Sequence, residues 1–291
     1  MIRRLLSIIM VIAIFCSFTV YTVNAETVNH KYTQAMSFLN EYLHELQNGD
    51  IDKALSHTDD SRIDLNAHVD RSGLSSKELS HIEYIEDGGI FRSDYAEESI
   101  VDYEILEETG KDIVTARIVF SNGHEAIVPF YLTHNEKDYM VRITTNDISE
   151  YGYENIKSAD LEVDRKNDNS LKGSTIWKDS YEFSYLYGTI YGIDSFSVSQ
   201  NGIKISGYQA NDSSDVGWNK KAEVIYSIVE RHWYGDYVWA TTGNAIIKNG
   251  SFTVQMVGKN SSQSNLRIRI ANQTHANPRS RGNGNIYSIS I

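Results

Sequence analysis

The sequence predicts an α+β unit, with helices followed by a curved antiparallel meander, and then an all-β unit resembling a sandwich or jelly roll. Two observations support this plan. Apolar residues recur at helical spacing early in the chain and at a period of two afterwards. The charge also changes sign near residue 168. Over 26–168, 31 acidic and 13 basic residues give −18, whereas over 169–291, 8 acidic and 12 basic residues give +4.

The first 25 residues have the pattern of a secretory signal. Arg3 and Arg4 precede the apolar run 5–20, and Val23-Asn24-Ala25 offers small residues for cleavage. We therefore expect a signal peptide over 1–25 and a secreted, extracellular protein with no membrane span after cleavage; a retained anchor is the alternative. The only cysteine, Cys16, lies in this segment, so the mature chain is expected to form no disulfide.

Helices are expected at the start of the first unit, which we place at 26–150. A first helix carries an apolar stripe, and Asn48-Gly49 ends it before a short second helix that Asp50 caps. Ser75-x-x-Glu78 is a capping box before a third helix. The apolar stripe consists of Tyr32, Met36, Leu39, Leu43 and Leu46.

Four alternating runs then predict the strands of the meander. Pro129 favours an edge strand or a bulge in the third run, because proline cannot donate to a ladder. The turns are expected at Gly110-Lys111, Asn122-Gly123 and Asn135-Glu136. The runs cover 101–105, 114–120, 126–132 and 139–143.

The long first helix, the phrase Asn48-Gly49-Asp50-Ile51-Asp52-Lys53-Ala54 and the late meander resemble the nuclear transport factor two-like superfamily, the cone-shaped fold shared with ketosteroid isomerases. The resemblance covers residues 28–148. It implies a sheet curled around a pocket that is catalytic in some members and a binding or dimerisation surface in others. A hydrolase or isomerase using this pocket is therefore the alternative function.

An isomerase-like pocket needs a carboxylate base and an oxyanion donor. The available residues of these types are Asp64, Asp94, Tyr95 and Tyr103, and none lies in a catalytic motif that we can match. We assign no catalytic residue. Whether the chain is an enzyme stays open, and the non-catalytic interpretation is preferred.

The second unit is expected at 173–291, after a polar linker at 151–172. About eight short strands at regular spacing, without a helical stripe, predict a β-sandwich or jelly roll. The strand runs are 181–187, 195–199, 203–208, 222–231, 237–241, 251–257, 265–271 and 285–291.

Motifs for metal, phosphate and acyl chemistry are absent from the sequence. It contains no His-Glu-x-x-His, no Gly-x-Ser-x-Gly and no phosphate loop. We expect no cofactor and no metal. Calcium is the alternative, at Asp164-x-x-x-Asp168 or Asp212-x-x-Asp215, although neither has the full ladder of oxygen ligands. The net charge of −12 argues against a general nucleic-acid binder.

Exposed aromatic and basic residues of the second unit are the candidate ligand-binding residues. Sugar rings stack on exposed aromatic side chains, with polar neighbours fixing their orientation. Trp177 and Trp239 are instead expected in the core. Arg267 and Arg269 alternate with Leu266, Ile268 and Ile270, so the two arginines share one face of their strand. They form either a basic patch or simply a solvated strand face. The candidates are Trp218, Trp233, Tyr234, Arg267 and Arg269.

The sequence therefore predicts an exported, non-catalytic binding protein of two domains. Its partner is expected to be a cell-wall or other envelope carbohydrate, or another exported protein.

Overall fold

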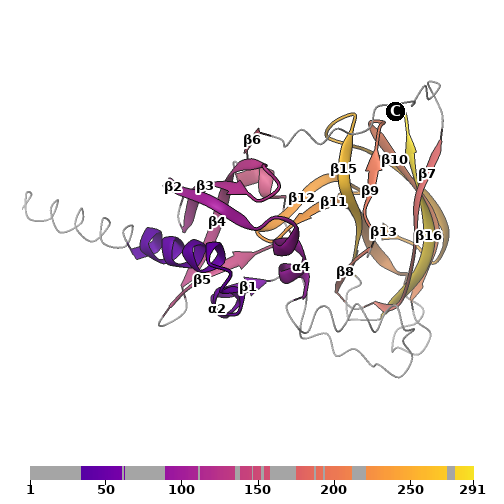
Figure 1. The fold of residues 1–291 in the computed structure, drawn as a ribbon. Coiled ribbons are helices and arrows are strands. Elements are labelled where there is room, and N and C mark those ends of the chain that lie inside the picture. Colours follow the sequence, from indigo (N-terminus) through magenta and orange to yellow (C-terminus); the bar gives the residue numbers. More distant parts are fainter. Residues whose placement is uncertain are drawn as a thin grey trace, which may run out of the picture.

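The computed structural model of this protein is predominantly β, with several antiparallel sheets (Figure 1). The signal segment, the capping box at Ser75, the turn at Asn135 and most of the linker at 151–172 lie outside the residues that the structure describes. Those residues are 34–60, 62, 89–110, 112–134, 138–145, 147–151, 154–157, 175–186, 188–192, 194–211, 221–273 and 279–291.

The first unit packs helices against one sheet. The sheet has the order β1-β5-β4-β3-β2, with β6 beside β4, and only the β1–β5 pair among these described strands is parallel. All four expected meander strands are present as β2 to β5. The elements are a helix over 34–47, α2 (Ile51–Ser56), β1 (Thr58–Asp60), α4 (Gly89–Glu97), β2 (Ile100–Gly110), β3 (Ile113–Phe120), β4 (Glu125–His134), β5 (Tyr139–Ile143), the 3-10 helix η2 (Ile148–Tyr151) and β6 (Glu154–Lys157).

The helix over 34–47 follows the predicted apolar stripe. Leu39, Leu43 and Leu46 are fully buried in the core that the helix forms with the sheet. The helix ends where Asn48-Gly49 predicts, because Gly49 adopts φ +79° and its N–H donates to the Leu46 carbonyl at 2.9 Å. Asp50 precedes α2 as expected, but its side chain makes no capping hydrogen bond, so that detail of the prediction is wrong.

Pro129 lies in a strand that is central rather than at an edge. β4 pairs with β3 along one side, where Pro129 is opposite Thr115. Along its other side β4 pairs with β6 at 125–127 and with β5 at 131–134. Pro129 therefore occupies the interval between two short partners, where its missing N–H interrupts neither ladder.

The second unit consists of two sheets in a sandwich-like arrangement. One has the order β14-β10-β16-β7 and the other β12-β11-β15-β8, with β13 beside β11 and β9 beside β15. Their inner faces share one hydrophobic core. Every expected strand run overlaps an observed strand. The strands are β7 (Ile176–Leu186), β8 (Thr189–Tyr191), β9 (Phe196–Val198), β10 (Gly202–Asn211), β11 (Glu223–His232), β12 (Gly235–Thr241), β13 (Ile246–Ile247), β14 (Gly250–Val257), β15 (Gln263–Asn272) and β16 (Ser280–Ile289).

Glycines on the inner face of the four-stranded sheet make room for aromatic rings. A Cβ at Gly207 or Gly284 would lie 2.6 Å from the Tyr181 hydroxyl, and a Cβ at Gly282 would lie 2.8 Å from the Phe183 ring. Both rings are buried in the sandwich core. The rings of β7 thus fill space that the glycines of β10 and β16 leave empty, which holds the three strands in register.

Candidate functional site

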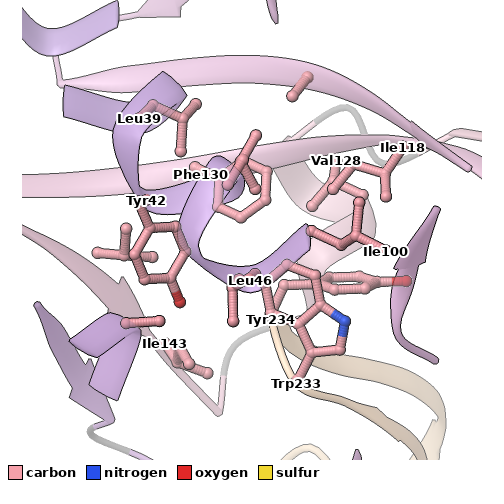
Figure 2. Packing of buried hydrophobic residues seen from close by; sticks show 14 of the residues in the cluster. Leu39, Tyr42, Leu46, Ile100, Ile118, Val128, Phe130, Ile143, Trp233 and Tyr234 are labelled. Atoms are coloured by element: carbon pink, nitrogen blue, oxygen red, sulfur yellow. The ribbon is translucent and has the colours of Figure 1, made fainter. Parts of the chain in front are cut away.

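Trp233 and Tyr234 are buried in the core of the first unit, so the expectation that they form an exposed platform is wrong. Their side chains are 0% and 5% exposed. They form the two-residue turn of the β11–β12 hairpin, because His232 pairs with Gly235 across it. Figure 2 shows both rings projecting from this hairpin of the second unit toward Leu46 and Ile100 of the first. We call these two residues the plug.

The plug makes ring contacts with three elements of the first unit: Trp233 contacts α4 and β4, and Tyr234 stacks on Phe120 of β3 at 5.7 Å between ring centroids. The Trp233 ring lies 5.9 Å from Phe91, 5.8 Å from Tyr95 and 6.0 Å from Phe130, between ring centroids. Its indole N–H donates to the Glu98 carbonyl at 3.1 Å. Aromatic side chains bury large areas at an interface. The plug therefore stabilises the contact between the units and leaves no exposed face on which a sugar could stack.

A cluster of charged side chains surrounds the plug at the junction of the units. The Arg62 side chain is fully buried; it donates to Asp60 at 2.7 Å and to the His232 carbonyl at 2.6 Å. Arg231 donates to Asp94 through Nε at 2.8 Å and through Nη2 at 2.7 Å. Burial raises the pKa of the Asp94 carboxyl, although the two arginines oppose this rise. Buried charges of this kind need their partners, so the cluster couples the two units.

His232 adds a titratable pair to the junction. Its Nδ1 lies 2.7 Å from a carboxylate oxygen of Glu98, and its ring stacks on Tyr234 at 4.9 Å. Burial by itself would lower the pKa of this imidazole, but Glu98 and other nearby carboxylates raise it to about 9. The ring is therefore a cation at neutral pH.

Arg267 and Arg269 lie at the same junction, so they form no exposed basic patch. Arg269 donates to Asp236 at 2.7 Å, and Tyr191 donates to the same carboxylate oxygen at 2.7 Å. Arg267 lies 3.8 Å from Glu97, and each arginine side chain is only 12% exposed. The predicted alternation along β15 is confirmed, since Leu266, Ile268 and Ile270 are buried in the sandwich core. The arginine side of β15 faces the first unit instead of solvent.

The residue types considered for catalysis serve structural contacts where the structure describes them. Asp94 is paired with arginines, the Tyr95 hydroxyl donates to the Leu46 carbonyl, and the Tyr103 hydroxyl donates to the Asn40 carbonyl at 3.1 Å. Asp64, Trp218 and the acids proposed for calcium lie outside the described residues. Among the residues that are described, no group of three or more His, Cys, Asp or Glu side chains has a metal-binding arrangement.

The outward-pointing side of the four-stranded sheet, which we call the outer face, is the stronger candidate for a binding site. Strand pairing aligns its side chains in three rows that cross all four strands. Most residues of the rows are exposed, whereas the positions between the rows are buried or partly buried; the buried ones are Ile205, Phe252, Ile286 and Tyr181. Row one is Gln255, Lys204, Tyr287 and Trp177; row two is Thr253, Ser206, Asn285 and Ser180; row three is Ser251, Tyr208, Asn283 and Glu182.

Trp177 is the most prominent residue of the outer face, so the expectation that it is a core residue is wrong. It is 59% exposed and pairs with Tyr287, whose ring has the Lys204 ammonium 4.7 Å from its centroid. A bulge explains the error: Ile286 pairs with Asp179 but Tyr287 pairs with Trp177, which adds one residue to β7. That extra residue moves Trp177 to the opposite face from Tyr181. Trp239, in contrast, is 1% exposed, and its expected place in the core is confirmed.

The outer face is turned away from the first unit. In Figure 1, β16, β10 and β7 lie on the far side of the sandwich, while β11 and β12 extend toward the first unit. A hollow of about 360 Å³ lies between β7 and β16 in rows two and three, lined in part by Ser180, Glu182, Asn283 and Asn285. The outer face therefore combines exposed rings with amide and hydroxyl groups.

Comparisons with known proteins yield weak similarities. No family model matches the chain, and no curated protein matches it. A solved chain from "Structure of infectious bursal disease virus Gx strain" is 10% identical with a TM-score of 0.21, over 59% of this chain and 44% of that one. A chain from "The structure of CBM51-2 in complex with GlcNAc and INT domains from Clostridium perfringens ZmpB" is 11% identical with a TM-score of 0.20, over 67% of this chain and 41% of that one. This chain thus spans less than half of either.

None of the helices in the described part of the chain combines the length and the apolarity that a bilayer span requires.

Proposed function

We propose that this chain is an exported, non-catalytic binding protein that recognises an uncharged carbohydrate of the cell envelope through the outer face. The observation that carries the proposal is the exposed Trp177 ring beside Tyr287, on a sheet face that otherwise carries amides and hydroxyls. Exposed aromatic rings accept the C–H faces of sugar rings, and placed polar groups fix the orientation of the ligand.

The charge of the outer face favours a neutral ligand. Its three rows contain one cation, Lys204, and one anion, Glu182, among twelve positions. The exposed amides of Asn283, Asn285 and Gln255 both donate and accept hydrogen bonds, as sugar hydroxyls do. A strongly charged polymer would instead require a patch of one sign.

The remaining parts of the chain have supporting roles in this proposal. The segment 1–25 directs export and is removed. The first unit adopts the cone-like fold of the nuclear transport factor two-like superfamily, which the helix over 34–47 on the antiparallel meander supports. The plug occupies its core, so we assign the first unit a scaffolding role and the sandwich-like unit the binding role.

Retention on insoluble polysaccharides tests the proposed function. The chain from Glu26 to Ile291 is incubated with cellulose, chitin, chitosan and purified cell walls, and the bound fraction is measured. We expect retention on an uncharged polymer and much less on cationic chitosan. Trp177→Ala should weaken binding by about tenfold or more, since about 1.4 kcal/mol of stacking is a factor of ten.

A matched control uses another exposed apolar residue. Ile247 is 58% exposed but lies in β13 of the opposite sheet. Ile247→Ala should leave retention unchanged. Retention on none of the uncharged polymers, or equal loss in the two variants, would refute the proposed function.

A further inference from the structure

The outer face carries aromatic rings at both of its ends. Trp177 and Tyr287 lie in row one, and Tyr208 lies in row three with 39% of its surface exposed. Row one and row three are four residues apart along β10, β14 and β16, which corresponds to about 13 Å, and the bulge adds one residue along β7. This spacing is longer than a single sugar ring.

Polar side chains fill the interval between the two aromatic ends. Row two contains Asn285 and a pair of hydroxyls, Ser206 and Thr253, whose oxygens are 3.0 Å apart. Asn285 and Asn283 also line the hollow beside β7. The order along the sheet is therefore ring, hydrogen-bonding groups, ring.

We propose that the outer face binds several linked sugars of a polysaccharide chain, which extends diagonally over β16 from Trp177 and Tyr287 to Tyr208. The inference rests on the proposed function and specifies its ligand class: an uncharged polymer of several linked sugars, rather than a monosaccharide. A chain of this length places one sugar on the rings of row one, another on Tyr208, and hydroxyls between them on row two.

Two linked contacts bind more tightly than either alone, because the second contact forms without a new loss of translational freedom. Affinity should therefore rise with chain length until the sugar reaches Tyr208. Shorter sugars should use row one only, since it holds two rings.

A ladder of oligosaccharides tests this inference. The probes are cello-oligosaccharides and fully acetylated chito-oligosaccharides from disaccharide to hexasaccharide, titrated into the chain from Glu26 to Ile291 by calorimetry. For the class of polymer that is retained, we expect the dissociation constant to fall about tenfold or more between disaccharide and hexasaccharide.

Tyr208→Ala tests the contribution of row three separately from that of row one. This variant should weaken hexasaccharide binding about fivefold to tenfold and change disaccharide binding less than about twofold. Trp177→Ala should weaken both. Asn283 lies in β16 and pairs with Tyr208, so Asn283→Ala is a second variant that should show the length-dependent pattern. The far-UV circular dichroism of each variant checks its folding.

The possible failures are distinguishable. Affinity that does not depend on length, or a Tyr208→Ala effect of equal size on disaccharide and hexasaccharide, would overturn the inference while the retention experiment still supports the proposed function. Retention on none of the uncharged polymers would overturn both.

Discussion

Trp233→Ala tests whether the plug holds the two units together. Removing a buried tryptophan costs about 3–5 kcal/mol of the free energy of unfolding. The upper half of this range is expected, because ring pairs contribute about 0.5–1.5 kcal/mol beyond their buried area and Trp233 has contacts with Phe91, Tyr95 and Phe130. The substitution also removes the hydrogen bond from the indole N–H to the Glu98 carbonyl, which costs about 1 kcal/mol of the free energy of unfolding. We therefore expect a loss of about 4–5 kcal/mol.

Urea unfolding followed by far-UV circular dichroism measures this loss, and Trp177→Ala is the matched control. The two substitutions remove the same atoms, but Trp177 is 59% exposed whereas Trp233 is fully buried. The control should change the free energy of unfolding by about 0.5 kcal/mol or less. An equal cost for the two tryptophans would refute the reasoning that the plug is a structural contact.

Three further predictions concern the junction. Asp94→Asn should lower the free energy of unfolding by about 3–5 kcal/mol in the same assay, because it leaves the buried Arg62 and Arg231 without the carboxylate of Asp94. Asp52→Asn, which breaks an exposed ion pair, should cost about 1 kcal/mol or less. Similar costs for the two variants would contradict the burial argument. Gly235→Ala should cost more than Gly123→Ala, because both have positive φ but only a Cβ at the former meets an isoleucine side chain, at 2.4 Å; unfolding curves showing the reverse order would rule this out. The free energy of unfolding should fall by about 3 kcal/mol as pH rises from about 6.5 to about 9. The pKa of His232 is higher in the folded chain than in the unfolded chain, so the protonated imidazole stabilises the fold, and this contribution is lost as the imidazole deprotonates. The pH dependence should be absent in His232→Gln, and an unchanged dependence would exclude His232 as its source.

Local pattern was sufficient for most of the secondary structure. The helix over 34–47 follows from its stripe and from Gly49, because both act within a few residues. The meander and the strands of the second unit follow from the period of two. These features depend on which face of a single helix or strand is apolar, and residues close together in the sequence determine that face.

The candidate site was poorly predicted for two physical reasons. Alternation counted back from Tyr181 puts Trp177 on the inner face, and a single bulged residue in β7 reverses that assignment without any signal in the sequence. The pairing of Tyr208 with Asn283, and hence the three rows, depends on the register between β10 and β16, which are far apart in the chain.

The sequence by itself determined most of the strands, the first helix and the change in charge between the two halves, because these are properties of short segments or of composition. The short strands β1, β6, β8 and β13 overlap none of the expected runs, and β6 lies in the segment expected to be the linker. Only the tertiary structure decided which aromatic residues meet solvent. Trp233 and Tyr234 occupy a short hairpin turn, a position that is normally exposed, and they are buried because another unit packs over that turn. Arg269 is similarly neutralised by Asp236, which lies far from it in the sequence. The burial of a turn residue depends on which distant segment packs over it, and the residues next to it in the sequence do not determine that.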